Sequence, residues 1–368
     1  MADRLRRIGV LTGGGDCPGL NAVLRAIVKT AAFDHGIDVV GIEDGYAGLI
    51  QDRMRPLEPS DVGGILARGG TILGSSNRDN PFRVPVDGEG DPAYRDRSTQ
   101  CLKNASRHGL DLLIVIGGDG SLSIANDLKG RGLPIIGVPK TIDNDLAATD
   151  LTFGFDSALE VATEAVDRLH TTAMSHHRVM VLEVMGRYAG WIALEAGIAG
   201  GGDVILIPEI PFELPHVAAA IRERWFRGRT FAIVVGAEGA APVGGDRVVA
   251  STVADSTDPI RLGGIGTWLA DQLGKHLDME TRATVLGHLQ RGGVPTAFDR
   301  ILGTRYGVHA VQAAVAGERD VMVCLRGRNI ETAPLEEAVR ELRRVDPQGA
   351  LVNAARSVGT SFGDRAPR

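Results

Sequence analysis

The sequence predicts an α/β protein in which doubly wound, mainly parallel sheets present their loops to one cleft. Short apolar runs alternate with helix-like segments, and a polar or glycine-rich loop follows most of the runs. This alternation is typical of parallel sheets that bind ligands at their strand ends. The chain has 49 glycines among 368 residues, and aromatic residues make up 4%, which suits many glycine-rich loops. Its length allows two or three domains, each with an ample core.

The first predicted unit consists of a strand, a glycine loop and a helix. The strand covers Arg7–Leu11 and the loop covers Thr12–Gly19. The helix that follows has its apolar residues on one face: Leu20, Val23, Leu24, Ile27 and Val28. Such a unit directs backbone N–H groups and a helix N-terminus at a phosphate, although a plain tight turn is the alternative. The spacing of a P-loop is absent from this segment.

Three segments lie between this unit and the next long apolar run. A strand over Val39–Ile42 leads to the loop 44–48, and residues 69–80 form another cluster of glycines and hydroxyls. Residues 86–98 are polar and rich in Gly, Asp and Pro. We therefore expect residues 86–98 to form an excursion on the surface rather than part of a core.

The run Leu112–Ile116 is continuously apolar, as expected of a central parallel strand. It ends in Gly117-Gly-Asp-Gly-Ser121, where glycines let a ligand approach the backbone. Asp119 can hold a magnesium ion directly or through water, and Ser121 can cap the next helix while contacting phosphate. The alternative is a glycine-rich capped turn without a ligand.

The segment in which we expect the chemistry follows the next strand. The run Ile135–Val138 is short and apolar, and it ends at Pro139, which cannot donate to a sheet. After it come a cation, a hydroxyl and two carboxylates: Lys140, Thr141, Asp143 and Asp145. This set suits an anionic substrate that carries a hydroxyl to be deprotonated. An Asp/Asn-rich turn that caps the next helix is the alternative.

The second half of the chain repeats the pattern. A Ser-x-x-Glu capping box at Ser157 predicts the start of a helix. Strands are predicted at 178–184, 204–207 and 231–235, and the last of them leads to Glu238. The segment Thr281–Gly293 holds two arginines and a histidine that suit a phosphate monoester, or that are solvated surface cations: Arg282, His288 and Arg291.

Composition and charge limit the class of protein. The net charge of −6 gives no general reason to expect nucleic-acid binding. The three cysteines are far apart, so neither a disulfide framework nor a zinc site is indicated. The sequence shows no signal peptide and no apolar run approaching 18 residues. We therefore expect a cytoplasmic protein with neither a membrane nor a nucleic acid as partner.

In order and spacing, the loops resemble those of the 6-phosphofructokinase family over roughly residues 7 to 330. The motifs that carry the resemblance are Thr12–Gly19, Gly117–Ser121, Pro139–Asp145, Met185–Gly190 and Thr281–Gly293. The resemblance implies two similar α/β domains with the active site in the cleft between them. It places the phosphoryl-donor domain at 1–154 plus about 290–340 and the sugar-phosphate domain at 155–289 plus about 341–358. Residues 359–368 are expected to form a flexible tail.

The resemblance also implies transfer of the γ-phosphoryl group of MgATP to the 1-hydroxyl of fructose 6-phosphate, with Mg²⁺ as cofactor. Asp143 would be the base, and Asp119 would bind the metal. The implied catalytic residues are Asp143, Thr141, Asp145 and Arg187. The implied donor-binding residues are Gly15, Tyr46, Arg78, Gly118, Asp119, Gly120 and Ser121. The implied acceptor-binding residues are Thr141, Ile142, Asp143, Arg178, Met185, Gly186, Arg187, Glu238, Arg282, His288, Leu289, Gln290 and Arg291.

Assembly follows from the same resemblance. Arg178 and Arg282 match arginines that reach a neighbouring subunit's site, which implies a homo-oligomer, with a tetramer favoured over a dimer. Arg78 stands one residue beyond the family's usual arginine, as if one residue were inserted.

The identity of the donor depends on two positions that give mixed signals. Pyrophosphate users of the family generally carry Asp at the position of Gly120 and Lys at that of Lys140, whereas typical ATP users carry Gly at both. An Asp side chain at 120 would obstruct ATP, so Gly120 favours ATP. The alternatives are a pyrophosphate-dependent enzyme and, more distantly, a non-catalytic sugar-phosphate sensor. NAD kinases and diacylglycerol kinases share only the Gly-Gly-Asp-Gly loop, and sedoheptulose 7-phosphate stays open as a second acceptor.

Overall fold

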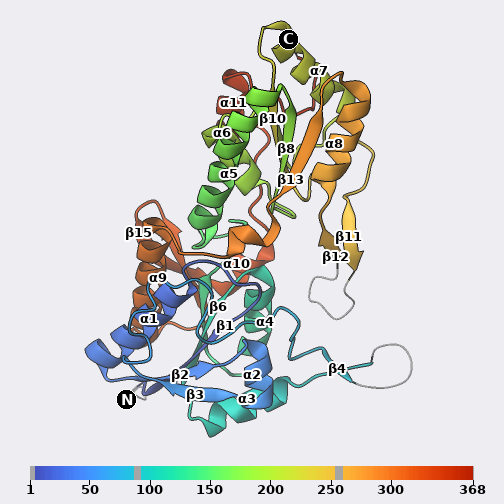
Figure 1. Cartoon of the computed structure of the whole chain (residues 1–368). Coiled ribbons are helices and arrows are strands. Elements are labelled where there is room, and N and C mark those ends of the chain that lie inside the picture. Colours follow the sequence, from blue (N-terminus) through green and yellow to red (C-terminus); the bar gives the residue numbers. More distant parts are fainter. Residues whose placement is uncertain (1–4, 87–92, 253–259, 368) are drawn as a thin grey trace.

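The computed structural model describes residues 5–86, 93–252 and 260–367, and it consists of two lobes stacked on one another (Figure 1). Each lobe is built around one sheet. This arrangement confirms the predicted α/β class with mainly parallel sheets. The predicted domain boundaries stay a prediction.

The sheet of the first lobe has the strand order β15-β14-β7-β6-β1-β2-β3. Its inner strands pair in parallel, while β3 and β15 are antiparallel at the two edges. The strands are β1 (Arg7–Thr12), β2 (Asp38–Ile42), β3 (Met54–Leu57), β6 (Leu112–Gly117), β7 (Ile135–Pro139), β14 (Val321–Arg326) and β15 (Asn329–Pro334). The strands predicted at 7–11, 39–42, 112–116 and 135–138 are thus present, each with a shift of one residue at most at either end.

Helices cover both faces of this sheet. One face carries α1 and α9, which pack on each other, and the other carries α4 and α10. The helices of this lobe are α1 (Leu20–Thr30) with the π-helical turn η1 (Ala31–His35), α2 (Tyr46–Gln51), α3 (Ser98–Arg107), α4 (Asp119–Lys129), α9 (Ala297–Val315) and α10 (Leu335–Arg340). Because both faces are covered, the inner strands are apolar throughout.

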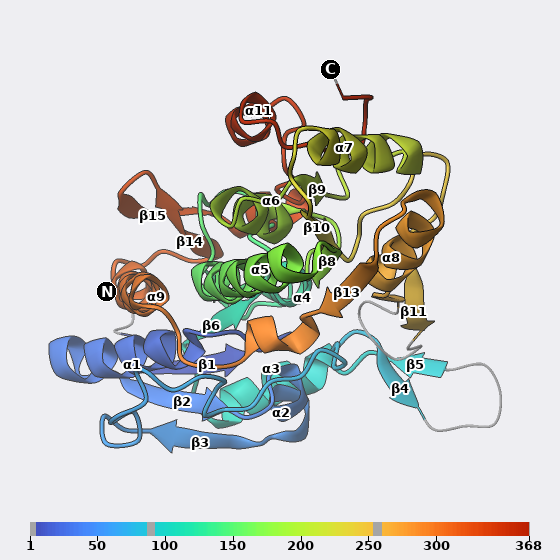
Figure 2. The same ribbon diagram turned by 45° about the horizontal axis from the view of Figure 1, so that its top comes forward.

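The sheet of the second lobe has the order β13-β8-β10-β9, with every pair parallel. Helices α5 and α6 cover one face, and α8 lies on the other with α7 beside it (Figure 2). The strands are β8 (Val179–Val184), β9 (Val204–Leu206), β10 (Ala232–Ala237) and β13 (Thr281–Val285). The helices are α5 (Phe155–His176), α6 (Trp191–Ala199), α7 (Leu214–Phe226), α8 (Ile265–His276) and α11 (Ala350–Ser357), with the 3₁₀ turn η2 (Gly287–Arg291).

Two short hairpins extend from the lobes on the same side (Figure 1). They are β4 (Val84–Val86) with β5 (Ala93–Arg95), and β11 (Val249–Thr252) with β12 (Ile260–Leu262). The first hairpin occupies the segment predicted as a surface excursion at 86–98, of which residues 87–92 lie outside the described structure.

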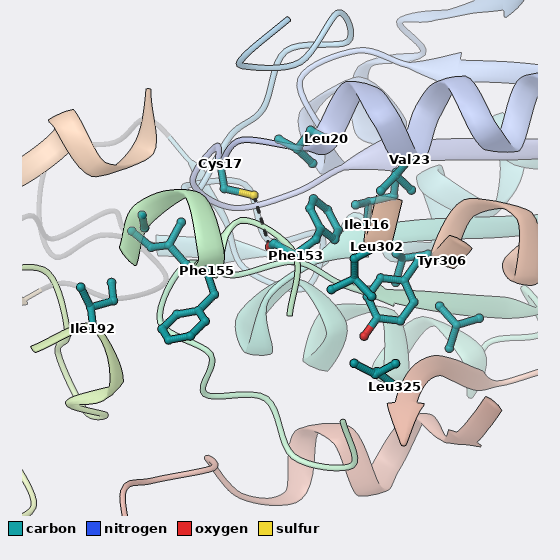
Figure 3. Packing of buried hydrophobic residues seen from close by; sticks show 14 of the residues in the cluster. Cys17, Leu20, Val23, Ile116, Phe153, Phe155, Ile192, Leu302, Tyr306 and Leu325 are labelled. Atoms are coloured by element: carbon teal, nitrogen blue, oxygen red, sulfur yellow. Dashed lines mark hydrogen bonds between the residues drawn. The ribbon is translucent and has the colours of Figure 1, made fainter. Parts of the chain in front are cut away.

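The chain passes between the lobes after β7, after β13 and after α10. Near the first passage the aromatic rings of Phe153 and Phe155 enter the core (Figure 3). The thiol of Cys17 donates to the carbonyl of Phe153 at 3.7 Å, which ties the glycine loop to this passage. Apolar residues of α1, α5, α6 and α9 belong to the same buried cluster, so the core continues from one lobe into the other.

The capping box predicted at Ser157 is wrong. Helix α5 begins earlier, at Phe155, and no local side chain caps it. Instead, the buried carboxylate of Asp299 in α9 accepts the N–H groups of Gly154 and Ser157 at 2.9 and 2.8 Å, and the hydroxyl of Ser157 at 2.6 Å. Asp299 therefore satisfies orphan amides of a helix that begins 144 residues before it in the sequence.

The flexible tail predicted at 359–368 is also wrong over its first part. Ser361 forms a parallel bridge with Val204 of β9, and Phe362 is 1% exposed. Arg356 holds Asp364 through two hydrogen bonds of 3.0 and 2.8 Å. Pairing to an edge strand, burial of an aromatic ring and a two-bond ion pair all oppose fraying.

Among the described residues, no helix is long and apolar enough to cross a membrane.

Candidate active site

A cavity of about 1010 Å³ lies where the two sheets face each other by the carboxyl ends of their strands. Loops after β1, β6 and β7 line it from the first lobe, and loops after β8, β10 and β13 line it from the second. Its volume lies at the upper end of the ~300–1,000 Å³ range of ligand pockets. The space therefore suits two ligands that meet between the lobes.

The glycine loop after β1 is held by side chains and backbone from three other segments. Lys140 is buried, and its Nζ donates to the carbonyl of Gly15 at 2.6 Å. Arg291 donates from Nη1 to the carbonyl of Asp16 at 3.1 Å. The N–H of Gly14 donates to the carbonyl of Ser76 at 3.0 Å. At Gly15 a Cβ would lie 2.6 Å from Nη1 of Arg291, so a larger residue would displace this guanidinium.

The loop after β6 forms the start of α4. The helix begins at Asp119, so Ser121 is its third residue and not its cap, which corrects the expectation from the sequence. The hydroxyl of Tyr46 donates to the carbonyl of Ser121 at 2.7 Å, and this hydrogen bond helps to fix the turn. A Cβ at Gly120 would meet no atom within 4 Å, so this side of the helix start opens into the cavity.

Two carboxylates enter the cavity after β7 on either side of Asn144. The N–H of Asp143 donates to the hydroxyl of Thr141 at 3.1 Å. Within the described part of the chain, Oδ1 of Asp143 is buried and has no hydrogen-bond partner. A buried acceptor without a hydrogen-bond partner destabilises a folded protein. An oxygen of this kind in a cavity is therefore placed to accept a proton or a hydrogen bond from a ligand.

Burial and mutual repulsion raise the pKa values of the acids in this cavity. Burial, with the charges of Asp143 and Asp119, raises the pKa of Asp145 to about 8. Burial also raises the pKa of Asp143, although Arg291 opposes the shift. At Glu238, burial together with the charge of Asp143 raises the pKa to about 7. Buried acids with shifted pKa values in a cleft are typical of catalytic sites.

Most of the predicted site residues meet in this cavity. From the donor group it contains Gly15, Tyr46, Arg78, Gly118, Asp119, Gly120 and Ser121, together with Lys140. From the acceptor group it contains Thr141, Asp143, Asp145, Met185, Arg187, Glu238, His288 and Arg291. Gly186 lies just behind, at a φ of 139° that favours glycine, and its carbonyl accepts the N–H of Gly239 at 3.1 Å.

Besides Gly186, five predicted acceptor residues do not line the cavity. Ile142 is in the core, Gln290 is buried, and Leu289 is 69% exposed. Arg178 and Arg282 both pair with Glu280 near the amino-terminal ends of β8 and β13. Within one chain, these two arginines therefore do not reach the cavity.

Several lining residues were not among the predicted ones. They are Gly14, Asp16, Thr71, Ser75, Ser76, Asn77, Asp79, Ile124, Tyr188 and Leu262. The sequence does indicate residues 69–80 as a candidate ligand loop, because glycines and hydroxyl residues cluster there. Leu262 is the last residue of β12 in the second hairpin and carries no polar signal, so the sequence does not indicate it.

The carboxylates fit a magnesium site of the usual enzyme type. No three His, Cys, Asp or Glu residues of the described chain stand close enough to hold a metal ion by themselves. Mg²⁺ commonly takes only one or two protein carboxylates and completes its shell with phosphate oxygens and water. Asp119 lines the cavity, and its charge adds to the raised pKa values of Asp143 and Asp145, so it stands near enough to share such an ion with a ligand.

A polar cavity between two parallel sheets, with a glycine loop, buried cations and buried acids, defines an α/β enzyme of the phosphoryl-transfer class. The sequence model of the phosphofructokinase family matches residues 7–314. The chain belongs to this family.

Relatives and a solved structure agree with the family. The chain is 55% identical to an ATP-dependent 6-phosphofructokinase of Chloroflexus aurantiacus over 99% of both chains. It is 52% identical to a pyrophosphate–fructose 6-phosphate 1-phosphotransferase of Amycolatopsis methanolica, over 93% of this chain and 97% of that one. Phosphofructokinase of Pichia pastoris in the T-state superposes with a TM-score of 0.79 at 34% identity, covering 98% of this chain and 37% of the yeast chain.

The raised pKa of Asp145 predicts that the stability of the folded protein decreases as the pH rises. The unfolded chain releases this proton near its ordinary pKa of 3.8, whereas the folded protein keeps it up to about pH 8. Folding therefore becomes less favourable as the pH rises between these values. We expect Asp145→Asn to raise the melting temperature at pH 8 by at least ~2 °C, and this gain to vanish toward pH 4.

Thermal unfolding of the ligand-free protein at constant ionic strength measures this gain. Asp271→Asn, at an exposed position of α8, is the matched control. An equal gain at pH 4 and pH 8 would contradict the assignment of the effect to the proton on Asp145.

Proposed function

We propose that this protein is an ATP-dependent 6-phosphofructokinase. It transfers the γ-phosphoryl group of MgATP to the 1-hydroxyl of fructose 6-phosphate, giving fructose 1,6-bisphosphate and ADP in glycolysis. The observation that carries the proposal is the buried Oδ1 of Asp143, which lacks a partner among the described residues and lies beside cations and a helix start. We place the protein in the cytoplasm, in keeping with its few, scattered cysteines.

Asp143 acts as the general base. Its free oxygen accepts the proton of the sugar hydroxyl as that oxygen attacks the phosphorus atom. Burial raises the pKa of Asp143, and the neighbouring cations Arg291, Lys140 and Arg187 offset part of this rise, which favours the carboxylate form. Arg187 and Arg291 line the cavity, where they also balance the charge that spreads over the transferred group.

The donor phosphates lie between the glycine loop and the start of α4. Helix α4 has 11 residues, and its N-terminal amides and dipole favour phosphate oxygens there. Arg78 stands at the exposed rim of the same cavity. When bound, Mg²⁺ neutralises the charge of the phosphates, and Asp119 is the residue of this chain that would hold it.

The sugar phosphate lies on the side of the second lobe. Met185 and Glu238 flank the sugar, while His288 and Arg291 suit its 6-phosphate. Arg291 donates to the carbonyl of Asp16 through Nη1, and its guanidinium carries further N–H groups that can bind a phosphate.

The choice of ATP rests on the surroundings of Gly120 and Lys140. The position of a Cβ at Gly120 is open, so the space that an Asp side chain would fill stays available to a nucleotide. The Lys140 ammonium is turned to the carbonyl of Gly15, which supports a role in holding the glycine loop. Pyrophosphate is the second candidate donor, because a relative named for it shares 52% identity.

Replacing the base tests the reaction. We expect Asp143→Asn to lower kcat by ~10²–10⁴ while binding of fructose 6-phosphate is largely kept, because only proton transfer is lost. A coupled assay for fructose 1,6-bisphosphate and calorimetric titration with fructose 6-phosphate measure the two quantities. A loss below about tenfold, or ~1.4 kcal/mol, in a folded variant would refute this role of Asp143.

Assaying the purified protein with magnesium and each donor in turn tests the choice of ATP. We expect turnover with ATP to exceed that with pyrophosphate. Gly120→Asp should lower ATP use by more than about tenfold, ~1.4 kcal/mol in the barrier, because its side chain and charge fill the nucleotide path. Gly120→Ala is the matched control for the added Cβ alone. Faster turnover with pyrophosphate in the unmodified protein would sink the ATP assignment.

The acceptor site is proposed to be completed by a second subunit, in a homo-oligomer with a tetramer favoured over a dimer. Arg178 and Arg282 lie outside the cavity of their own chain, on the side of edge strand β13. Apolar side chains are exposed along the same stretch of chain: Val285, Leu289, Val294, Phe298 and Ile301. An exposed edge with apolar residues, and with arginines that lie outside their own chain's cavity, suits contact with a second copy.

Subunit mixing tests this assembly. Asp143→Asn and Arg282→Ala are each expected to be inactive alone. A mixed oligomer regains activity, because one of its shared sites receives Asp143 and Arg282 from unmodified positions. Asp143→Asn mixed with Asp119→Asn is the control, since both changes lie in the same chain's part of a site. No recovery after exchange confirmed by mass spectrometry would show that each site is built from one chain.

A further inference from the structure

We propose that Arg343 is a positioning residue that fixes the angle between the carboxylates of Asp143 and Asp145 through its hold on Asn144. This inference rests on the proposed function, since it concerns the same base. Arg343 lies in the segment between α10 and α11, 198 residues beyond Asp145 in the sequence.

Asn144 adopts a backbone conformation that requires support. Its φ is 51°, in the left-handed region that residues other than glycine adopt at some cost. This residue is buried, and the left-handed step turns both neighbouring aspartates toward the cavity. Its side-chain Oδ1 accepts the N–H of Thr152 at 3.1 Å. Its carbonyl accepts Nη1 of Arg343 at 3.2 Å.

Arg343 is itself attached to the catalytic loop along its backbone. Its N–H donates to the carbonyl of Asp145 at 2.8 Å, and Leu342 forms an antiparallel bridge with Leu146. The backbone contact persists in any variant that keeps an N–H at this position. The contact to Asn144 depends on the guanidinium alone, which makes that contact testable by mutation.

The same residue contacts the second lobe at the start of α6. The guanidinium of Arg343 lies over the ring of Trp191, 4.4 Å from its centroid, and the indole N–H donates to the Arg343 carbonyl at 3.0 Å. Trp191 begins α6 directly after the loop that carries Met185 and Arg187. Glu209 joins the two segments further, since it accepts the N–H of Gly190 at 3.0 Å and that of Val345 at 2.9 Å.

These contacts place the base loop and the sugar loop in a fixed relation. The hydroxyl bound by the second lobe has to meet the carboxylate of the first within hydrogen-bond reach. A displacement of about 1 Å can cost ~10²-fold in rate without any loss of a reacting group. Arg343 touches the base loop and Trp191, the first residue after the sugar loop, so its side chain is placed to control kcat more than binding of the sugar phosphate.

Arg343→Met keeps the unbranched stem and removes the charge and the donors. We expect its kcat to fall at least about tenfold, with the dissociation constant of fructose 6-phosphate within about threefold of that of the unmodified protein. Arg343→Lys keeps a donor that reaches the Asn144 carbonyl and should recover part of the loss. Arg340→Met, at an exposed position one turn earlier in α10, is the matched control and should be neutral.

A double-mutant cycle separates positioning from general stability. If Arg343 acts through the position of Asp143, then Arg343→Met in an Asp143→Asn background should lower kcat far less than tenfold. Fully multiplicative effects, or a kcat loss that follows the melting temperature, would overturn the inference. Activity of Arg343→Met at the unmodified level, with Asp143→Asn inactive, would overturn it and leave the proposed function intact. Absence of phosphofructokinase activity in the unmodified protein would instead refute the function.

Discussion

Most polar loops of the cavity stand where parallel strands end, and this common edge is the constraint on which the structure depends. Parallel strands need crossover connections, so helices cover the sheet faces and only loops remain free at the edge. Two such edges face each other, one in each lobe. Glycines, cations and acids therefore gather in the cavity, as a site for two phosphorylated ligands requires.

The same placement buries charged groups, and this burial destabilises the folded protein. Asp143, Asp145 and Glu238 lie so deep that their pKa values rise, and Lys140 is buried with a lowered pKa beside them. Such groups lower the free energy of unfolding, in line with the trade between stability and activity that active sites show. Hydrogen bonds to loop carbonyls and a nearby opposite charge offset only part of the cost.

Local patterns in the sequence predicted the inner strands of the first sheet and several loops of the cavity, because apolar runs and the loops behind them are local properties. The first strands and the loops at Asp119 and Asp143 were found in this way. The cap of α5 was not, because Asp299 comes from another helix far along the chain. Arg343 and Phe362 lie in segments without a motif, and their importance comes only from contacts with distant residues, Asn144 and β9 among them.

The late return of the chain to its first sheet bears on biosynthesis. Strand β7 ends at Pro139, but its outer neighbour β14 begins only at Val321. The sheet of the second lobe already has all its strands when Val285 has emerged from the ribosome. During synthesis the first lobe therefore keeps an unpaired, apolar edge at β7 while the sheet of the second lobe can already form. An unpaired strand edge of this kind promotes aggregation and is a binding site for chaperones.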